Sequence, residues 1–232
     1  MPHVPRPKRH PYDQWCPDAR ALDLVGDKWT LLIVRDLAAG PLRFVELQRV
    51  LPGISTEQLR SRLNRMVADG MLTRKRFREV PPRVDYALTE RARDLMPVIG
   101  ELARWGYEWA WSEPHPHETV QVDAIFRLAP GLSAAEGAAG TVQAEVTDGE
   151  RCSYAFTLSS DGVTVEQGLS EDATGARITG TTGAWIDAFS HARDRGGLEI
   201  SGQRELGEAL LDGLCALGEA DGSRDSQQRR AA

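Results

Sequence analysis

The sequence is short of several features that mark common classes of protein. Its 232 residues include 3 cysteines, Cys16, Cys152 and Cys215. An odd number at wide spacing excludes a disulfide framework and shows no zinc-ligand pattern. No apolar run approaches the roughly 18 residues of a transmembrane helix, and no secretory leader is evident. We therefore expect a soluble, cytoplasmic protein with no membrane partner.

The chain also lacks the short motifs of familiar enzymes. It has no G-x-S-x-G elbow, P-loop, H-E-x-x-H pair or glycine-rich dinucleotide loop. His3, His10, His115 and His117 show no ligand spacing. These absences predict a protein that is not an enzyme and that uses no cofactor and no metal.

The charge is distributed unevenly along the chain. Residues 1–112 hold 19 Lys and Arg against 14 Asp and Glu, a net charge of +5, whereas residues 113–232 hold 9 against 20, a net charge of −11. This asymmetry predicts two domains with different partners. The positive half is suited to nucleic-acid phosphates, which would repel the acidic half.

The most informative stretch lies in residues 51–90. Ser55 and Gln58 form a capping-box pattern at the start of a helix that Gly70 ends. The apolar stripe of this helix consists of Leu59, Leu63, Met66 and Val67. Its opposite face and flanks carry Glu57, Arg60, Ser61, Arg62, Asn64 and Arg65. Such a face can contact base edges and phosphates in a major groove.

Two predicted strands follow the helix directly. They cover residues 71–77 and 83–88, and Pro81-Pro82 prevents ladder hydrogen bonds at the tip between them. Helix and hairpin together predict binding to double-stranded DNA. The predicted DNA contacts are Lys28, Ser55, Thr56, Glu57, Gln58, Arg60, Ser61, Arg62, Asn64, Arg65, Arg78, Pro82 and Arg83. For Arg62 the alternative is an internal ion pair, and for Arg78 and Arg83 it is plain surface charge. Trp29 is predicted to belong to the core.

The rest of the chain divides by composition. The predicted parts are a basic arm (1–14), a DNA-binding and dimerisation domain (15–111), a polar linker (112–118), a second domain (119–218) and a disordered tail (219–232). Further helices of the first domain are predicted at 17–25, 28–39, 42–50 and from Thr89 to about 111, with Pro97 kinking or restarting the last one.

That last helix carries an apolar stripe. It consists of Leu95, Val98, Ile99, Leu102, Trp105 and Trp109. The stripe belongs either to the core of the domain or to a dimer interface, and tryptophans just before a linker favour the interface. A two-fold dimer would let one helix per subunit contact two half-sites about one DNA turn apart.

The second half changes from helical periodicity to alternation. Apolar residues alternate in 142–146, 154–158, 163–165 and 176–178, and Asp148-Gly149 and Asp161-Gly162 between these runs predict hairpins. One helix is predicted around Trp185, another from Leu206 to Leu217 with Gly218 after it, and a strand at Leu198–Ser201 between them.

The first half closely resembles the HxlR-type winged helix-turn-helix regulators. The matching words are Cys16-Pro17, Leu24-Val25-Gly26-Asp27-Lys28-Trp29-Thr30, Arg43-Phe44-Val45-Glu46-Leu47, Leu51-Pro52-Gly53-Ile54-Ser55, Leu59, Arg62-Leu63, Asp69-Gly70, Glu79-Val80-Pro81-Pro82-Arg83-Val84-Asp85-Tyr86 and Leu88-Thr89-Glu90. The resemblance covers about residues 12–110. It implies a homodimeric transcriptional repressor or activator, and we expect a repressor. Its recognition helix would begin at Ser55, and Thr56 replaces the proline usual there.

The second half resembles the sterol-carrier-type lipid-binding fold. The likeness rests on Asp161-Gly162-Val163, on Ile178-Thr179-Gly180 before the Trp185 helix, and on 197–202 before a leucine-rich helix. The predicted fold class is therefore α+β, with an N-terminal winged helix-turn-helix domain and a C-terminal sterol-carrier-like α/β sandwich. In that sandwich, helices would cover an antiparallel sheet.

The second resemblance implies an apolar ligand between sheet and helices. The candidate pocket residues are Tyr154, Phe156, Trp185, Phe189, Leu210 and Leu214. Alternatively these side chains simply close a filled core. A lipophilic effector would control DNA binding from this domain. Two other interpretations stay open: a ligand-free domain used for dimer or partner contacts, and a lipid-binding or transfer protein with a residual DNA module.

The cysteines leave one further question open. Some relatives of this type carry a redox-sensing cysteine near the position of Cys16, so this thiol is either a sensor or a structural residue. Cys152 and Cys215 fall in strand and helix patterns and are predicted to be core.

Overall fold

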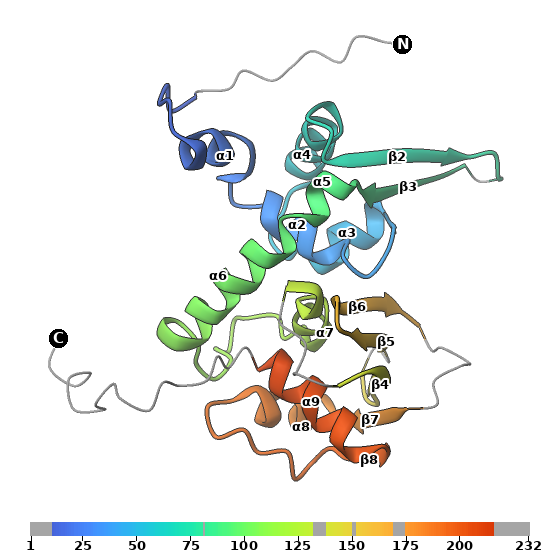
Figure 1. Ribbon diagram of the computed structural model, residues 1–232. Coiled ribbons are helices and arrows are strands. Elements are labelled where there is room, and N and C mark those ends of the chain that lie inside the picture. The colour runs from blue at the N-terminus through green and yellow to red at the C-terminus, as the bar shows by residue number, and fades with distance from the viewer. Residues whose placement is uncertain (1–10, 81, 132–137, 150–151, 169–174, 216–232) are drawn as a thin grey trace, which may run out of the picture.

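The computed structural model describes residues 11–80, 82–131, 138–149, 152–168 and 175–215. These residues form two units, each with its own hydrophobic core (Figure 1). The predictions for most of the basic arm, for Pro81 and for the tail, including Leu217 and Gly218, lie outside the described residues.

The N-terminal unit is helical with a small three-stranded sheet. Its elements are α1 (Pro17–Val25), α2 (Thr30–Asp36), β1 (Leu42–Arg43), α3 (Phe44–Val50), α4 (Thr56–Ala68), β2 (Leu72–Phe77), β3 (Arg83–Leu88), α5 (Glu90–Arg93) and α6 (Met96–Trp109). The sheet has the order β1-β3-β2 and is antiparallel. The two-residue strand β1 was not predicted, because it is too short to give an alternating pattern.

Local signals explain where α4 begins and ends. The Ser55 hydroxyl accepts a hydrogen bond from the Gln58 N–H at 3.2 Å, and the Gln58 side chain accepts one from the Ser55 N–H at 3.1 Å. This is the predicted capping box. Gly70 follows the helix with φ of +72°, a conformation that suits glycine.

Two other helices of this unit differ from their predicted extents. α2 begins at Thr30, and Asp27 in the preceding turn accepts the N–H groups of Trp29 at 2.9 Å and Thr30 at 3.1 Å. The single helix predicted after Thr89 is two helices, α5 and α6. Pro97 lies in the first turn of α6, where a missing N–H costs nothing, so it restarts the helix.

The C-terminal unit combines a five-stranded sheet with helices. Its elements are α7 (Val122–Phe126), the 3₁₀ turn η1 (Ala129–Gly131), β4 (Gly140–Val146), β5 (Cys152–Ser159), β6 (Gly162–Gln167), β7 (Ala176–Gly180), α8 (Thr182–Phe189), β8 (Glu199–Gly202) and α9 (Arg204–Leu214). The strand order is β6-β5-β4-β7-β8. Both predicted Asp-Gly turns are present, between β4 and β5 and between β5 and β6.

The prediction of a wholly antiparallel sheet is wrong at one pair of strands. β4 and β7 are parallel. The chain leaves the edge strand β6 and returns on the far side of β4, so β7 runs in the direction of β4. The short helix α7 was also not predicted, because its 5 residues are too few for a helical pattern.

One face of the sheet forms the core with α7, α8 and α9. Alternate residues such as Val142, Ala144 and Val146 are buried there, while the opposite face carries polar groups. On that face Gln143 accepts hydrogen bonds from the Arg177 guanidinium at 2.8 and 3.1 Å. The alternation seen in the sequence therefore reports a sheet covered on one side.

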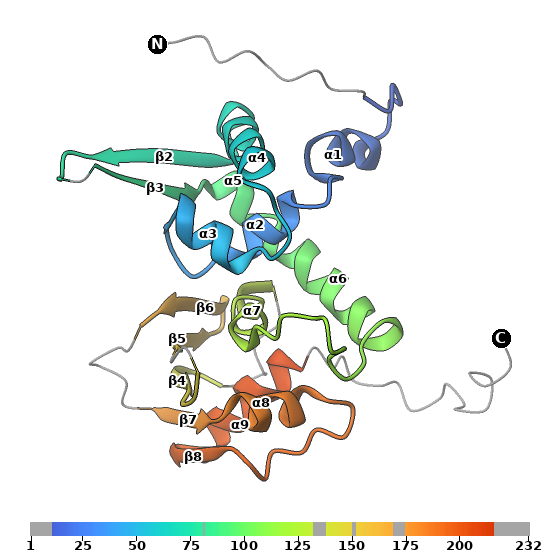
Figure 2. The same ribbon diagram turned by 180° about the vertical axis from the view of Figure 1, so that it is seen from behind.

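The long helix α6 connects the two units and packs against both (Figures 1 and 2). Gly100 of α6 lies so close to η1 that a Cβ there would be 1.8 Å from the carbonyl oxygen of Gly131. The Tyr107 hydroxyl donates to the carbonyl of Leu214 at 3.4 Å, and Trp111 Nε1 donates to the carbonyl of Phe189 at 2.9 Å. The two cores are therefore joined along one face of α6.

Within the part of the chain that the structure describes, no helix is both long enough and apolar enough to cross a membrane.

Candidate nucleic-acid interface

Helix α4 presents its polar face to solvent. Leu59, Leu63 and Met66 are buried beneath it. The first turns carry a continuous exposed set of predicted contacts, namely Ser55, Thr56, Glu57, Gln58, Arg60 and Ser61. The structure therefore brings the N-terminal half of this helix to the surface as one polar patch.

Neighbouring side chains already orient part of this patch. The Thr56 hydroxyl accepts a hydrogen bond from Gln48 Nε2 of α3 at 2.9 Å. Arg60 and Glu57 form an exposed ion pair at 3.2 Å. An exposed pair of this kind contributes little to stability, so Arg60 is free to exchange Glu57 for a phosphate or a base edge.

Arg62 and Arg65 are held inside the unit. Arg62 forms an ion pair with Asp27 at 2.9 Å, which is the internal pairing predicted as its alternative role. Burial lowers the pKa of Arg62, and Asp27 opposes that shift. Arg65 pairs with Asp69 at 3.9 Å, and Asn64 is half-buried. Arg62 thus ties α4 to the turn just before α2.

The hairpin β2–β3 extends away from the unit as a wing (Figure 1). Arg83, the first residue of β3 after the tip, donates to both carboxylate oxygens of Asp85, with distances of 2.6 to 3.0 Å. These hydrogen bonds lower the pKa of Asp85 and raise the pKa of Arg83. Arg78 and Pro82 are exposed nearer the tip. Arg83 is therefore the most constrained of the predicted wing contacts.

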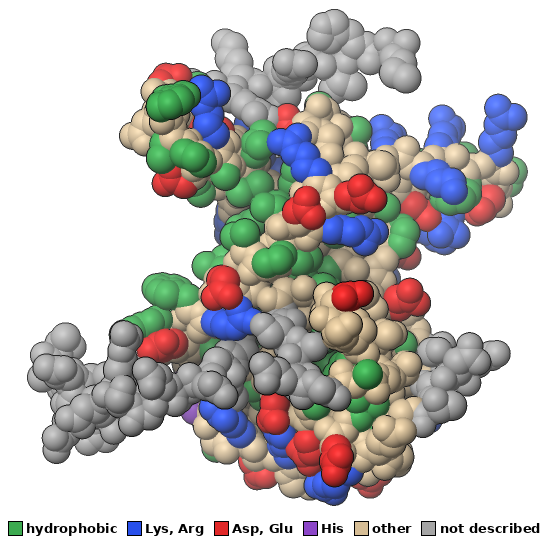
Figure 3. Space-filling view, in the orientation of Figure 1, with side chains coloured by type: hydrophobic (Ala, Val, Ile, Leu, Met, Phe, Trp, Pro, Cys, Tyr) green, Lys and Arg blue, Asp and Glu red, His purple; other side chains and the backbone are tan. Residues whose placement is uncertain are grey.

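The wing carries further basic residues that were not among the predicted contacts. Arg74, Lys75 and Arg76 follow one another on β2 and are all exposed. Lys and Arg side chains accordingly line the projecting hairpin (Figure 3). The signal that could have identified them is the word Leu72-Thr73-Arg74-Lys75-Arg76-Phe77, which places three cations in one strand.

Lys28 and Trp29 occupy the start of α2. Trp29 is 8% exposed and packs in the core, as predicted. The Lys28 ammonium lies 4.9 Å from the centre of the Trp29 ring and is exposed.

The predicted dimerisation stripe on α6 divides into two parts. Ile99 is buried in the core of its own chain and Leu95 is half-buried. Val98, Leu102, Trp105 and Trp109 are 53 to 61% exposed. Leu22 of α1 is also exposed, at 46%, and so is Trp15, two residues before α1 begins, at 96%. Two helices of one unit therefore leave large apolar side chains uncovered.

The predicted ligand-pocket residues fill the interior of the C-terminal unit. Tyr154, Phe156 and Trp185 are fully buried, and Phe189, Leu210 and Leu214 are nearly so. Phe126 packs edge-on against four of these rings at centroid distances of 4.8 to 6.3 Å. These side chains pack together as core residues, and a ligand pocket among them stays a prediction.

The cysteines differ in environment. Cys16 is exposed and its thiol donates to Asp18, whereas Cys215 is buried. Cys152 is half-buried, and burial raises the pKa of its thiol to about 11. In the described part of the chain, no three His, Cys, Asp or Glu side chains are grouped to hold a metal ion.

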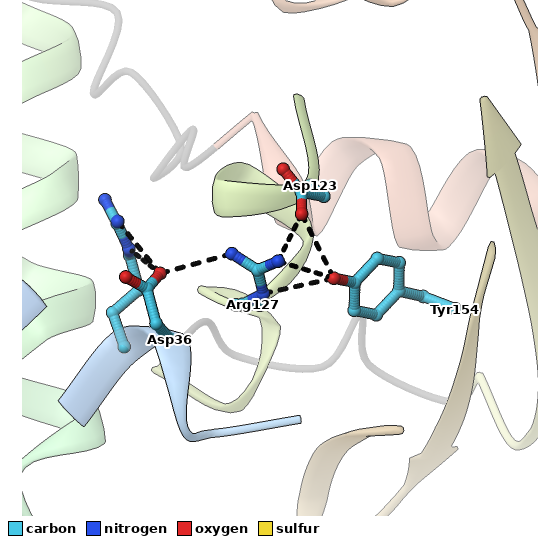
Figure 4. Close-up of polar contacts among 5 residues, drawn as sticks. Asp36, Asp123, Arg127 and Tyr154 are labelled. Carbon is cyan, nitrogen blue, oxygen red and sulfur yellow. Dashed lines mark hydrogen bonds and ion pairs between the residues drawn. The ribbon is translucent and has the colours of Figure 1, made fainter. Parts of the chain in front are cut away.

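A buried charged network joins the two units (Figure 4). Arg127, 3% exposed, pairs with Asp36 of α2 at 3.2 Å, with Asp123 of α7, and with the Tyr154 hydroxyl at 2.7 Å. Burial raises the pKa of Asp36, which also pairs with Arg35 at 2.9 Å. Burial opposes the charge on Arg127, but Tyr154, Asp123 and Asp36 together raise its pKa. The network was not predicted from the sequence, because Asp36 and Tyr154 are 118 positions apart and no local pattern links them.

Fold and surface together define the class of the N-terminal unit, a winged helix-turn-helix of the kind found in transcriptional regulators. The profile described as HxlR-like helix-turn-helix matches residues 24–114. An HTH-type transcriptional regulator of Synechocystis sp. is 38% identical over 98 residues, which cover 42% of this chain and 73% of that protein. A second, from Halalkalibacterium halodurans, is 42% identical over 91 residues, covering 39% of this chain and 80% of that protein. The chain belongs to the HxlR-like helix-turn-helix family.

A third relative matches a similar share of this chain. An HTH-type transcriptional regulator of Bacillus subtilis is 35% identical over 97 residues, covering 41% of this chain and 90% of that protein. The profile match ends at residue 114, before α7 begins the C-terminal unit.

Proposed function

We propose that the protein is a homodimeric transcriptional repressor that binds a two-fold operator in double-stranded DNA. The observation that carries the proposal is the exposed polar N-terminal half of α4 beside a wing rich in arginine. In this class of fold the N-terminal residues of the recognition helix contact base edges, and the wing contacts the backbone or the minor groove.

The roles within the interface follow from exposure and pairing. Thr56, Gln58, Arg60 and Ser61 are the base-edge contacts, and Lys28, Arg78 and the cations of β2 are the phosphate contacts. Arg62 and Arg65 act indirectly by holding α4. Arg83 contacts DNA only if it exchanges its bidentate partner Asp85.

Dimerisation would use the uncovered apolar face of α6 together with α1. A symmetric pair of such faces gives a closed two-fold assembly. The C-terminal unit covers the opposite face of α6, so it leaves this surface accessible. We further propose, from the resemblance of short sequence words, that this unit is sterol-carrier-like and that a lipophilic effector controls DNA binding.

DNA binding is tested by fluorescence anisotropy of the full-length protein on recovered genomic fragments at several salt concentrations. The logarithm of the affinity should fall by about 0.9 per neutralised phosphate for each log unit of salt. Arg60→Ala should weaken binding about tenfold or more, since a bidentate base contact contributes ~1–3 kcal/mol.

Arg204→Ala is the matched control, because Arg204 is an exposed arginine of the C-terminal unit with a side chain 74% accessible. It should bind as the wild type does. Unchanged binding by Arg60→Ala would contradict the assigned role of α4. A second candidate, a lipid carrier with a residual DNA module, predicts no salt-dependent DNA binding at all.

A further inference from the structure

A cavity of about 980 Å³ lies between the two units. One wall is the start of α2 with Trp29 and Leu32, continued by the turn at residues 50–53. The linker at 110–121 forms a second wall, and α7 and α8 form the floor with Ile125 and Ile186. Pockets for drug-sized ligands measure roughly 300–1,000 Å³ and occur preferentially at domain interfaces.

Among the described residues, the aromatic interior of the C-terminal unit is closely packed, whereas the cavity is open. In that interior the aromatic rings of Phe126, Tyr154 and Trp185 are fully buried and packed edge to face. Phe189 belongs to both places, since it packs on that aromatic cluster and also lines the cavity. A ligand in the cavity would therefore rest on the outer surface of the core.

The walls favour a neutral lipophile. Exposed apolar side chains face the space, with Leu32, Trp111 and Val120 at 36, 40 and 42% exposure. The indole of Trp111 is fixed by its hydrogen bond to Phe189, so it offers a rigid aromatic surface.

The charges around the cavity balance. Lys28 and Arg35 face Glu113 and Glu118, with His115 and His117 also in the lining. Arg35 is already paired with Asp36, and Glu118 accepts the His115 backbone N–H at 2.9 Å. An ion would meet no net opposite charge here. The polar sequence of residues 216–232, with three Asp or Glu and three arginines, is likewise a poor occupant of apolar walls.

We propose that this interdomain cavity binds a neutral aromatic or polycyclic lipophile, and that its occupancy changes the affinity for DNA. The turn at 50–53 leads directly into the cap of α4 at Ser55, and Lys28 is a proposed phosphate contact. A ligand in the cavity would contact the linker, the C-terminal unit and this turn. Through the turn it would act on the start of the recognition helix α4. It shifts DNA affinity to the extent that it prefers one arrangement of the two units.

The site is tested by titrating the full-length protein with Nile red, a neutral lipophilic dye, in the absence of DNA. We expect saturable fluorescence enhancement with one dye per chain. Ala124→Trp places an indole in the cavity from the half-buried floor position on α7 and should abolish this binding. Leu32→Asp puts a charge on an exposed wall residue that the fold tolerates, and it should weaken binding at least tenfold.

Val45→Asp is the matched control, because Val45 is an exposed apolar residue, 65% accessible, outside the cavity lining. It should bind the dye as the wild type does. Wild-type binding by both cavity variants would overturn the site, since the dye would then occupy another apolar surface such as α6. Binding that appears only after deletion of 216–232 would also overturn it, by showing that the chain itself fills the cavity.

The link to DNA rests on the proposed function and has its own measurement. Saturating Nile red should change the dissociation constant for DNA by fivefold or more in the wild type and not in Ala124→Trp, in line with typical coupling between sites. An unchanged constant with the dye bound would overturn the coupling. A protein that binds dye but no DNA would instead contradict the proposed function and leave the site supported.

Discussion

Arg127 forms polar contacts with both units of the molecule. It reaches the buried Asp36 of the N-terminal unit and, in the C-terminal unit, the buried Tyr154 and the half-buried Asp123. A buried pair of this kind contributes modestly as long as it is intact, and it becomes costly once one partner is removed. The residue therefore holds the two units in one arrangement.

Arg127→Met should lower the free energy of unfolding by about 3 kcal/mol, the lower end for a broken buried pair, because Arg35 still pairs with Asp36. Chemical denaturation measures the change. Adding Asp36→Asn should recover part of the loss, since it removes the buried charge. A loss no larger than that of the exposed Arg204→Met would refute the structural role of Arg127.

Some contacts of single residues in the proposed DNA interface could be predicted from the sequence, and others could not. The capping box of Ser55 and Gln58 was predictable because it is a local pattern, and it is present. The internal pair of Arg62 was foreseen as an alternative, but its partner Asp27 was not. The pairing of Arg83 with Asp85 depends on strand pleating that brings residues two apart to one side, and nothing in the words themselves revealed it.

At the scale of elements, α6 has two faces with different partners. One face meets η1 through two glycines, and the other exposes large apolar side chains. The stripe was predicted from periodicity, which cannot separate a core from an interface. Which residues of the stripe are covered depends on tertiary packing: Ile99 packs in the N-terminal core, and Val98 stays exposed.

Gly100→Ala should destabilise the protein by about 1–3 kcal/mol, because its Cβ would overlap the carbonyl of Gly131 and force α6 away from η1. Gly106→Ala on the same helix is the control. Among the described residues outside its own stretch of helix, no atom lies within 4 Å of a Cβ placed there, so this variant should stabilise by about 0.5–1 kcal/mol. Thermal melts of both variants check this, and equal effects would contradict the close contact.

Leu102→Glu should convert the dimer to a monomer, because it places a charge in the exposed stripe of α6. Multi-angle light scattering at several protein concentrations measures the mass. Val45→Glu introduces the same group at another exposed apolar position and should remain dimeric. A Leu102→Glu protein that keeps the wild-type mass would show that the dimer, if formed, uses another surface.

In the C-terminal unit, short local signals predicted the hairpins but not the pairing of distant strands. Hairpins marked by Asp-Gly turns were predictable because two residues decide them. The parallel pairing of β4 and β7 was not, because it depends on which side of the sheet the chain chooses after β6. The helix α7 escaped notice for its brevity, although it supplies Asp123, next to Arg127, and a wall of the interdomain cavity.

The whole molecule places a positive unit on an acidic one. Helix α4 and the wing lie at the end remote from the C-terminal unit, so the acidic residues are kept away from the surface proposed to face DNA (Figures 1 and 3). The charge asymmetry of the sequence predicted two domains with different partners, and the difference in partners stays a prediction. It did not predict that the two units would share α6, the Arg127 network and a cavity, because these contacts join distant residues.

DNA recognition by a two-fold dimer is tested by selecting bound sequences from a random double-stranded DNA library with the full-length protein. We expect enrichment of an inverted repeat whose half-sites are about one helical turn, ~10 base pairs, or a multiple of it apart. Arg60→Ala should lose this enrichment and Arg204→Ala should keep it. Failure of the wild type to enrich any two-fold sequence, with the folded state verified, would contradict the account.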